Sequence, residues 1–155
     1  MKDCVGCTVQ LAVVSHIVVL HNCSDVTLSV CCGRFLVSSR FVSSLTSRAS
    51  SSLLLYLYTP TNPLFVQTDS AECVVAPYNI PRTRLLARLQ EAGLEGRNCW
   101  SIGLDRNADH FTCAMLPPEK FAPFVGEDGS DEMDLPLLPT AYEDQMRRSL
   151  KLLSA

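Results

Sequence analysis

An internal repeat of 19 residues limits the folds that are open to this chain. A shift of 19 places Cys4 on Cys23 and Thr8 on Thr27, and most of the segment between and after them also matches. The other matched pairs are Cys7 with Val26, Val9 with Leu28, Gln10 with Ser29, Leu11 with Val30, Val13 with Cys32, Ile17 with Leu36 and Val18 with Val37. Within each copy, apolar side chains alternate with small or polar ones, which is the pattern of a β-strand.

Further strands are predicted after the two copies. Residues 41–52 include six serines and predict a protruding loop. Leucines then alternate with tyrosines, which predicts a third strand with leucines on one face and tyrosines on the other. These residues are Leu53, Leu55, Leu57, Tyr56 and Tyr58. Shorter apolar runs predict strands over residues 64–66 and 73–76.

Strand units of this length, with no helix between them, cannot each bury an apolar face alone. Stacked in register as the coils of a parallel β-helix they can, because equivalent side chains form ladders along one interior. An antiparallel sandwich is the alternative, since short strands joined by turns also suit that fold. The 19-residue self-match favours the β-helix.

Composition excludes several classes of function. The 155 residues are 47% hydrophobic and 19% charged, which is typical of one globular domain rather than a disordered chain. Thirteen Lys and Arg against sixteen Asp and Glu leave a net charge of −3, so nucleic acid is not an expected partner. The most apolar stretch, residues 11–20, is short and contains Ser15 and His16, so no membrane span is expected.

The eight cysteines are expected to be reduced. The first residues lack the regions of a signal peptide, which predicts a cytosolic chain in which thiols persist. A metal site would combine Cys4 and Cys7 with Cys31 and Cys32, but adjacent cysteines suit a tetrahedral zinc site poorly. We therefore interpret the cysteines as small apolar core residues and predict no metal and no other cofactor.

A short amphipathic helix is predicted from Pro81 to Gly93. Its apolar face consists of Leu85, Leu86, Leu89 and Ala92. Its other face carries Arg82, Arg84 and Arg88. We interpret these arginines as a solvated face rather than an anion site, because no glycine-rich loop precedes the helix.

The remaining chain is predicted to be an irregular extension followed by a second helix. Residues 127–134 contain five carboxylates, whose spacing fits a solvated acidic loop rather than a calcium-binding EF-hand loop. Thr140 and Glu143 form a capping box that opens the second helix, which is expected to dock through an apolar stripe. The stripe consists of Tyr142, Met146, Leu150 and Leu153. The predicted divisions of the chain are 1–100, 101–139 and 140–155.

Several motifs, taken in order, resemble the tubulin-binding cofactor C domain family. They are Cys-x-x-Cys-x-Val-x-Leu from Cys4, Val30-Cys31-Cys32, Val75-Ala76-Pro77-Tyr78-Asn79, Ala92-Gly93-Leu94 and Asn98-Cys99-Trp100. The resemblance covers about residues 4–100 and implies the right-handed parallel β-helix that this family shares with the cyclase-associated proteins. The prolines and apolar residues of 116–125 and 135–139 resemble a subgroup of the family that acts at centrosomes and basal bodies.

The resemblance also implies that one position carries the catalytic arginine in those family members that are active. Members that stimulate GTP hydrolysis by tubulin or a small G protein use the arginine of a Gln-x-Arg motif, which stabilises charge on the transferring phosphoryl group. That motif falls on Arg34-Phe35-Leu36, so Leu36 stands where the arginine is expected. Leucine cannot donate a hydrogen bond, and the repeat predicts that Leu36 lies beneath the apolar Ile17. Arg34 is displaced by about 6.6 Å along a strand, and Arg40 is further away.

We therefore predict a non-catalytic interaction module. His16, His21 and His110 belong to no recognisable catalytic motif, and no G-x-S-x-G, H-E-x-x-H or Walker motif occurs. The resemblance implies a cytoskeletal or centrosomal partner, tubulin or a small G protein among them, and a role in positioning centrosomes, basal bodies and organelles. The alternative is a GTPase-activating protein for tubulin or an ARF-like G protein that uses Arg34.

The start of the chain adds one expectation. The first strand begins by Cys7, so only six residues precede it and the first coil is expected to be open. An open strand edge invites pairing, which predicts a tendency to associate. Because family members carry an additional N-terminal region, the chain is expected to be part of a longer protein.

Overall fold

A computed structural model describes residues 1–38, 51–66, 71–101, 112–121, 133–136 and 138–153. Its strands are β1 (Thr8–His21), β2 (Val26–Ser38), β3 (Ser51–Tyr58), β4 (Leu64–Val66), β5 (Ala71–Pro77), β6 (Arg82–Thr83), β7 (Thr112–Met115) and β8 (Met133–Asp134). Its helices are α1 (Leu85–Glu91), the 3₁₀ turn η2 (Pro118–Lys120) and α2 (Thr140–Leu153). The prediction of a mainly β chain with a C-terminal helix is confirmed, but β7 and β8 follow α1 rather than precede it.

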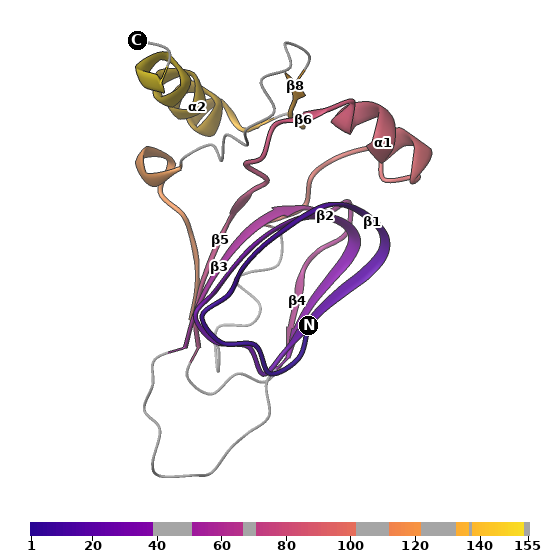
Figure 1. Ribbon diagram of the computed structural model, residues 1–155, viewed down its shortest axis with the longest axis vertical. Coiled ribbons are helices and arrows are strands. Elements are labelled where there is room, and N and C mark those ends of the chain that lie inside the picture. The colour runs from indigo at the N-terminus through magenta and orange to yellow at the C-terminus, as the bar shows by residue number, and fades with distance from the viewer. Residues whose placement is uncertain (39–50, 67–70, 102–111, 122–132, 137, 154–155) are drawn as a thin grey trace.

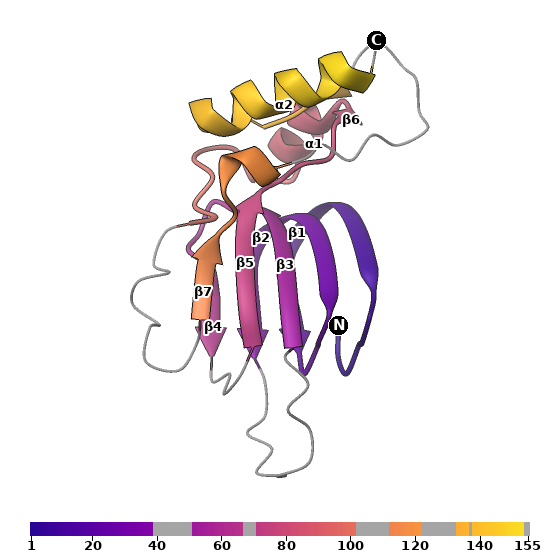
Figure 2. The same cartoon turned by 90° about the vertical axis from the view of Figure 1, so that its left-hand side faces the viewer.

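The main sheet is parallel, which excludes the antiparallel sandwich. The strands follow the order β1-β2-β3-β5-β7, and β4 pairs with β2 off this path. The strands β1 and β2 curve, so that β2 pairs with β3 along its first half and with β4 at its end (Figure 1). The helices α1 and α2 lie at the same end of the strands (Figure 2).

The 19-residue repeat is confirmed only over its first part. Thr8 pairs with Thr27 and Val9 with Leu28, as predicted. Irregularities between Gln10 and Val13, and again between Val14 and Ile17, then change the register. At each one β1 contains an extra residue relative to β2, as in a β-bulge. The predicted pairs beyond this point are wrong: Val13 pairs with Cys31, Ile17 with Arg34 and Val18 with Phe35.

The core consists of apolar ladders that run across the strands. Leu28, Leu55 and Val75 occupy paired positions on β2, β3 and β5, and all three are completely buried. Reduced cysteines belong to the same core, as predicted. Cys32 and Cys73 are buried within it, while Cys4, Cys7 and Cys23 are half-buried against it.

The tyrosine face of β3 is also covered. The ring of Tyr56 lies 6.2 Å from that of Phe121, which follows η2. The Phe121 ring lies 5.3 Å from Tyr142 of α2, and the Tyr142 ring lies 5.7 Å from Trp100. The Tyr142 hydroxyl donates to the Leu116 carbonyl, so the predicted docking of α2 is confirmed for Tyr142 and for the buried Met146.

Both helices start differently from the predictions. The first begins at Leu85 rather than Pro81, because residues Arg82–Thr83 form β6 against β8 and Arg84 has a φ of 57°. Leu86 is 50% exposed, so it does not belong to the buried face that contains Leu85 and Leu89. At α2 the Glu143 N–H donates to the Pro139 carbonyl (3.0 Å), so Pro139 rather than Thr140 is the N-cap residue.

Parts of the chain that were predicted as loops contribute strands. The strand β7 pairs with β5 and β8 with β6, both within the segment predicted to be irregular. The serine-rich loop lies outside the described residues, except for its last two residues, which begin β3. The acidic loop lies outside them up to residue 132. Within the described residues, no helix combines the length and apolar character needed to cross a membrane.

Asn98 joins the end of β3 to the loop that follows α1. Its amide oxygen accepts from the N–H groups of Thr59 (3.0 Å) and Trp100 (3.2 Å). Its amide nitrogen donates to the Leu57 carbonyl at 3.0 Å. One side chain thus satisfies three backbone groups of the fold.

Replacing Asn98 by alanine should lower the free energy of unfolding by about 2 kcal/mol or more, because the N–H groups of Thr59 and Trp100 lose their acceptor. The Leu57 carbonyl loses one of its two donors and keeps the Tyr78 N–H. Chemical denaturation of Asn98→Ala and of the parent chain measures this difference. Asn62→Ala is the matched control, since Asn62 is exposed and its loss should change stability by less than about 0.5 kcal/mol. Equal effects of the two substitutions would contradict the role of Asn98.

Candidate functional site

Arg34 and Leu36 lie on the outer face of β2. Phe35 and Val37 are buried, with 2% and 3% of their surface exposed. Because successive side chains of a strand point to opposite faces, the residues on either side of Phe35 point outward. Arg34 is exposed and Leu36 is half-buried. The prediction that Leu36 lies beneath Ile17 is wrong, because Leu36 pairs with Val19 and Ile17 pairs with Arg34.

Leu36 belongs instead to a row of apolar side chains across the outside of the sheet. It pairs with Val19 of β1 on one side and with Leu64 of β4 on the other. Leu64 is 54% exposed, and Ile17, which pairs with Arg34, is 51% exposed. We call Ile17, Val19, Leu36 and Leu64 the outer apolar row. Adjacent exposed apolar residues of this kind are typical of a contact surface for another protein.

Arg34 lies beside this row at a shallow hollow of about 400 Å³. The hollow is lined by Ser15, His16, Ile17, Gly33 and Arg34. A Cβ at Gly33 would lie 2.9 Å from the carbonyl oxygens of Ser15 and His16, so glycine allows β1 and β2 to approach closely there. Arg34 makes no hydrogen bond or ion pair with any other described residue, and its guanidinium is available to a partner.

The histidines do not form a catalytic group in the described part of the chain. His16 is exposed at the hollow, and the Nδ1 atom of His21 lies 2.8 Å from the Ser38 hydroxyl oxygen. His110 and Arg40 lie outside the described residues. Among the residues that the structure describes, no three His, Cys, Asp or Glu side chains are close enough together to hold a metal ion.

The adjacent cysteines of β2 are poorly suited to metal binding. Cys31 packs with Tyr58 and Tyr78 in one apolar cluster, whereas Cys32 packs in the main core. Burial raises the pKa of the Cys32 thiol to about 12. Burial and the neighbouring Cys32 also raise the pKa of Cys31. Both side chains are therefore neutral thiols at physiological pH, while a metal ligand or nucleophile needs the thiolate.

The arginines near α1 do not share one face. Arg82 lies on β6, and its Nε donates to the Tyr78 hydroxyl at 3.0 Å. Arg84 and Arg88 are exposed, and Arg84 forms a solvated ion pair with Glu91 at 3.9 Å. The prediction of a solvated face is thus confirmed for Arg84 and Arg88 and wrong for Arg82.

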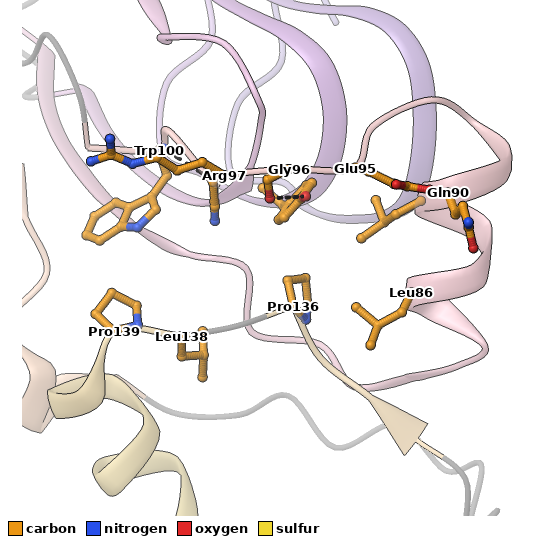
Figure 3. A pocket seen from close by; sticks show the side chains of 12 residues that line it. Leu86, Gln90, Glu95, Gly96, Arg97, Trp100, Pro136, Leu138 and Pro139 are labelled. Carbon is orange, nitrogen blue, oxygen red and sulfur yellow. Dashed lines mark hydrogen bonds between the residues drawn. The ribbon is translucent and has the colours of Figure 1, made fainter.

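A cavity of about 550 Å³ lies between α1, the loop after it and the segment before α2. Figure 3 shows Trp100, Arg97 and Gly96 on one wall and Pro136, Leu138 and Pro139 on the other. Tyr58, Leu86, Leu89, Gln90, Glu95 and Asn98 complete the lining. The volume is in the range of ligand pockets, but the lining lacks a nucleophile paired with a base and suits an apolar group.

Sequence reasoning missed both the outer apolar row and this cavity. The pairing of Leu36 with Val19 depends on the bulges of β1, which the repeat does not reveal. The cavity depends on residues 136–139 approaching a loop some 40 positions earlier in the sequence. The lone tryptophan, Trp100, was the available signal, since a large aromatic side chain often lines a binding pocket.

A parallel sheet that carries apolar side chains on its outer face is typical of a domain that contacts another protein. The family model described as tubulin binding cofactor C matches residues 1–104. The chain therefore belongs to the tubulin binding cofactor C family, which gives it a tubulin-related cofactor role. A comparison with curated protein sequences gives no significant match.

The buried thiols should make the protein less stable in alkali. A thiol with a raised pKa in the fold contributes its full stability below the ordinary value of 9.0 and loses it as the pH rises from there towards 12. Denaturation at a series of pH values should show the free energy of unfolding falling by up to about 1.4 kcal/mol per pH unit for each such thiol. Cys32→Ala should flatten this dependence, because it removes one of the two buried thiols. Equal slopes in the parent chain and Cys32→Ala would contradict the assignment.

Proposed function

We propose that this chain is a non-catalytic interaction module that binds a tubulin-related partner through the outer apolar row and Arg34. One observation carries the proposal. Leu36, which aligns with the arginine of the family's Gln-x-Arg motif, lies on the outer face of β2 among other apolar side chains. The position is thus suited to touch a partner, and its side chain is not suited to catalysis.

A leucine at position 36 can contribute to binding of a partner but not to the partner's GTP hydrolysis. An arginine at this position would bring a guanidinium to the partner's nucleotide, where it stabilises charge on the transferring phosphoryl group. Leucine offers only apolar contact, which adds to the contact made by Ile17 and Leu64. A partner could therefore bind this face with no acceleration of its GTP hydrolysis.

A second candidate function is GTPase activation by Arg34. This arginine is exposed on the same face, beside the hollow at Gly33, and forms no interaction with another described residue. Its Cα is displaced by about 6.6 Å from the aligned position, so its partner would have to bind in a shifted position. Tubulin and an ARF-like G protein are the partners to test.

Two finer assignments belong to the same proposal. We propose that the curved parallel strands are successive coils of a right-handed β-helix, which agrees with the paired ladders and with the family. We also propose that the chain acts like tubulin cofactor C domain-containing protein 1, in the cytoskeleton at centrosomes or basal bodies. Its role there would be to position these structures and associated organelles.

The first test is GTP hydrolysis by tubulin, with cofactors D and E, and by an ARF-like G protein. The parent chain should give no stimulation, because Leu36 cannot stabilise the phosphoryl group. Leu36→Arg should create stimulation if the partner binds this face. Stimulation by the parent chain that disappears in Arg34→Ala would contradict the non-catalytic proposal and support the second candidate.

The second test measures binding of tubulin and asks whether the contact lies at the outer apolar row or at the cavity. Leu64→Glu places a charge in the outer apolar row and should weaken binding of tubulin by roughly tenfold or more. Leu86→Glu is the matched control, because Leu86 is similarly exposed (50% against 54%) but lines the cavity. Loss of binding in Leu86→Glu alone would move the contact to the cavity and contradict the proposed face.

A further inference from the structure

The cavity beside α1 has walls that hydrogen bonds of the fold hold in place. On one wall the Tyr58 hydroxyl donates to the carbonyl oxygens of Leu94 (2.9 Å) and Gly96 (3.1 Å), and Figure 3 draws the second bond as a dashed line. On the other wall the Pro139 carbonyl accepts from two N–H groups in the first turn of α2, at 2.9 and 3.0 Å. The cavity of about 550 Å³ is therefore preformed, as ligand pockets usually are.

Most of the lining is apolar. Two leucines come from α1, and two prolines and a further leucine come from the segment that leads into α2. These residues are Leu86, Leu89, Pro136, Leu138 and Pro139. An apolar molecule between the two walls would remove this surface from water, which favours its binding.

The indole of Trp100 places one buried polar group in the same cavity. Trp100 is only 5% exposed and belongs to the lining. Its backbone N–H donates to the Asn98 side chain, but its indole N–H has no acceptor among the residues that the structure describes. In Figure 3 the indole nitrogen lies at the edge of the ring that faces the wall of Pro139. A buried donor without an acceptor is costly, so the cavity is suited to a ligand that supplies one.

A positive charge lies on the same wall as this donor. Arg97 is exposed and lines the cavity, and its guanidinium makes no hydrogen bond or ion pair with another described residue. The only carboxylate among the described lining residues is that of Glu95, which Figure 3 shows near Gln90, away from Trp100. Because charged donors and acceptors form the stronger hydrogen bonds, the wall of Trp100 and Arg97 suits a carboxylate.

We propose that this cavity binds a small apolar molecule that carries one carboxylate, such as a medium-chain fatty acid. The hydrocarbon chain packs on the leucines and prolines, and the carboxylate accepts from the indole of Trp100 and the guanidinium of Arg97. A polypeptide segment fits less well, because its repeated backbone groups would need more partners than this apolar lining offers. The site shares no residue with the outer apolar row, so it is independent of the proposed partner contact.

The indole of Trp100 also serves as the probe, because the chain contains a single tryptophan. In the full chain labelled with ¹⁵N, the indole N–H gives its own NMR signal. Octanoate, kept below the concentration at which it forms micelles, should shift this signal until the site is saturated. Octanol should bind roughly tenfold more weakly because it lacks the charge, and octylamine should give no saturable shift. A signal that octanoate does not move, or equal affinities for octanoate and octylamine, would overturn the proposal.

Two pairs of variants locate the ligand. Arg97→Gln should weaken octanoate binding roughly tenfold and leave octanol binding unchanged, whereas Arg88→Gln, an exposed position outside the lining, should change neither. Leu86→Glu puts a carboxylate in the apolar lining and should abolish octanoate binding. Leu64→Glu, at a similarly exposed position on β4, should not. Unchanged affinity for octanoate in both Arg97→Gln and Leu86→Glu would show that the ligand binds elsewhere and overturn the proposal.

Discussion

The register between β1 and β2 determines which side chains lie beside each other on the outer face of the sheet. Two bulges in β1 change the pairing before the strands reach Arg34. Beyond them Phe35 and Val37 point inward and Leu36 points outward, between Val19 and Leu64. A constant 19-residue register would have paired Leu36 with Ile17 instead. The two extra residues thus determine which apolar residue of β1 lies beside Leu36: Val19 rather than Ile17.

The motifs that carry the family resemblance serve mainly to hold the fold together. Asn79 accepts a hydrogen bond from the buried Ser29 hydroxyl at 3.0 Å, and Asn98 satisfies three backbone groups. The Trp100 ring packs edge-on against Tyr142. A buried polar group that loses its hydrogen-bond partner lowers the free energy of unfolding, so the fold requires Asn79 and Asn98. They identify the family, while the proposed binding without catalysis depends on the exposed Arg34 and the half-buried Leu36.

Alternation of side chains was enough to predict β1 to β3, and short apolar runs were enough to predict β4 and β5, because each strand has an apolar interior face. The boundaries of α1 were not predictable in the same way. Residues 82–83 form a strand because residues 133–134, far away in sequence, pair with them. β7 was missed for a similar reason, since only its pairing with β5 makes four residues a strand. The resemblance to the family motif pointed to Arg34 and Leu36, but the pairing of these residues with β1 depends on bulges that composition and periodicity do not reveal.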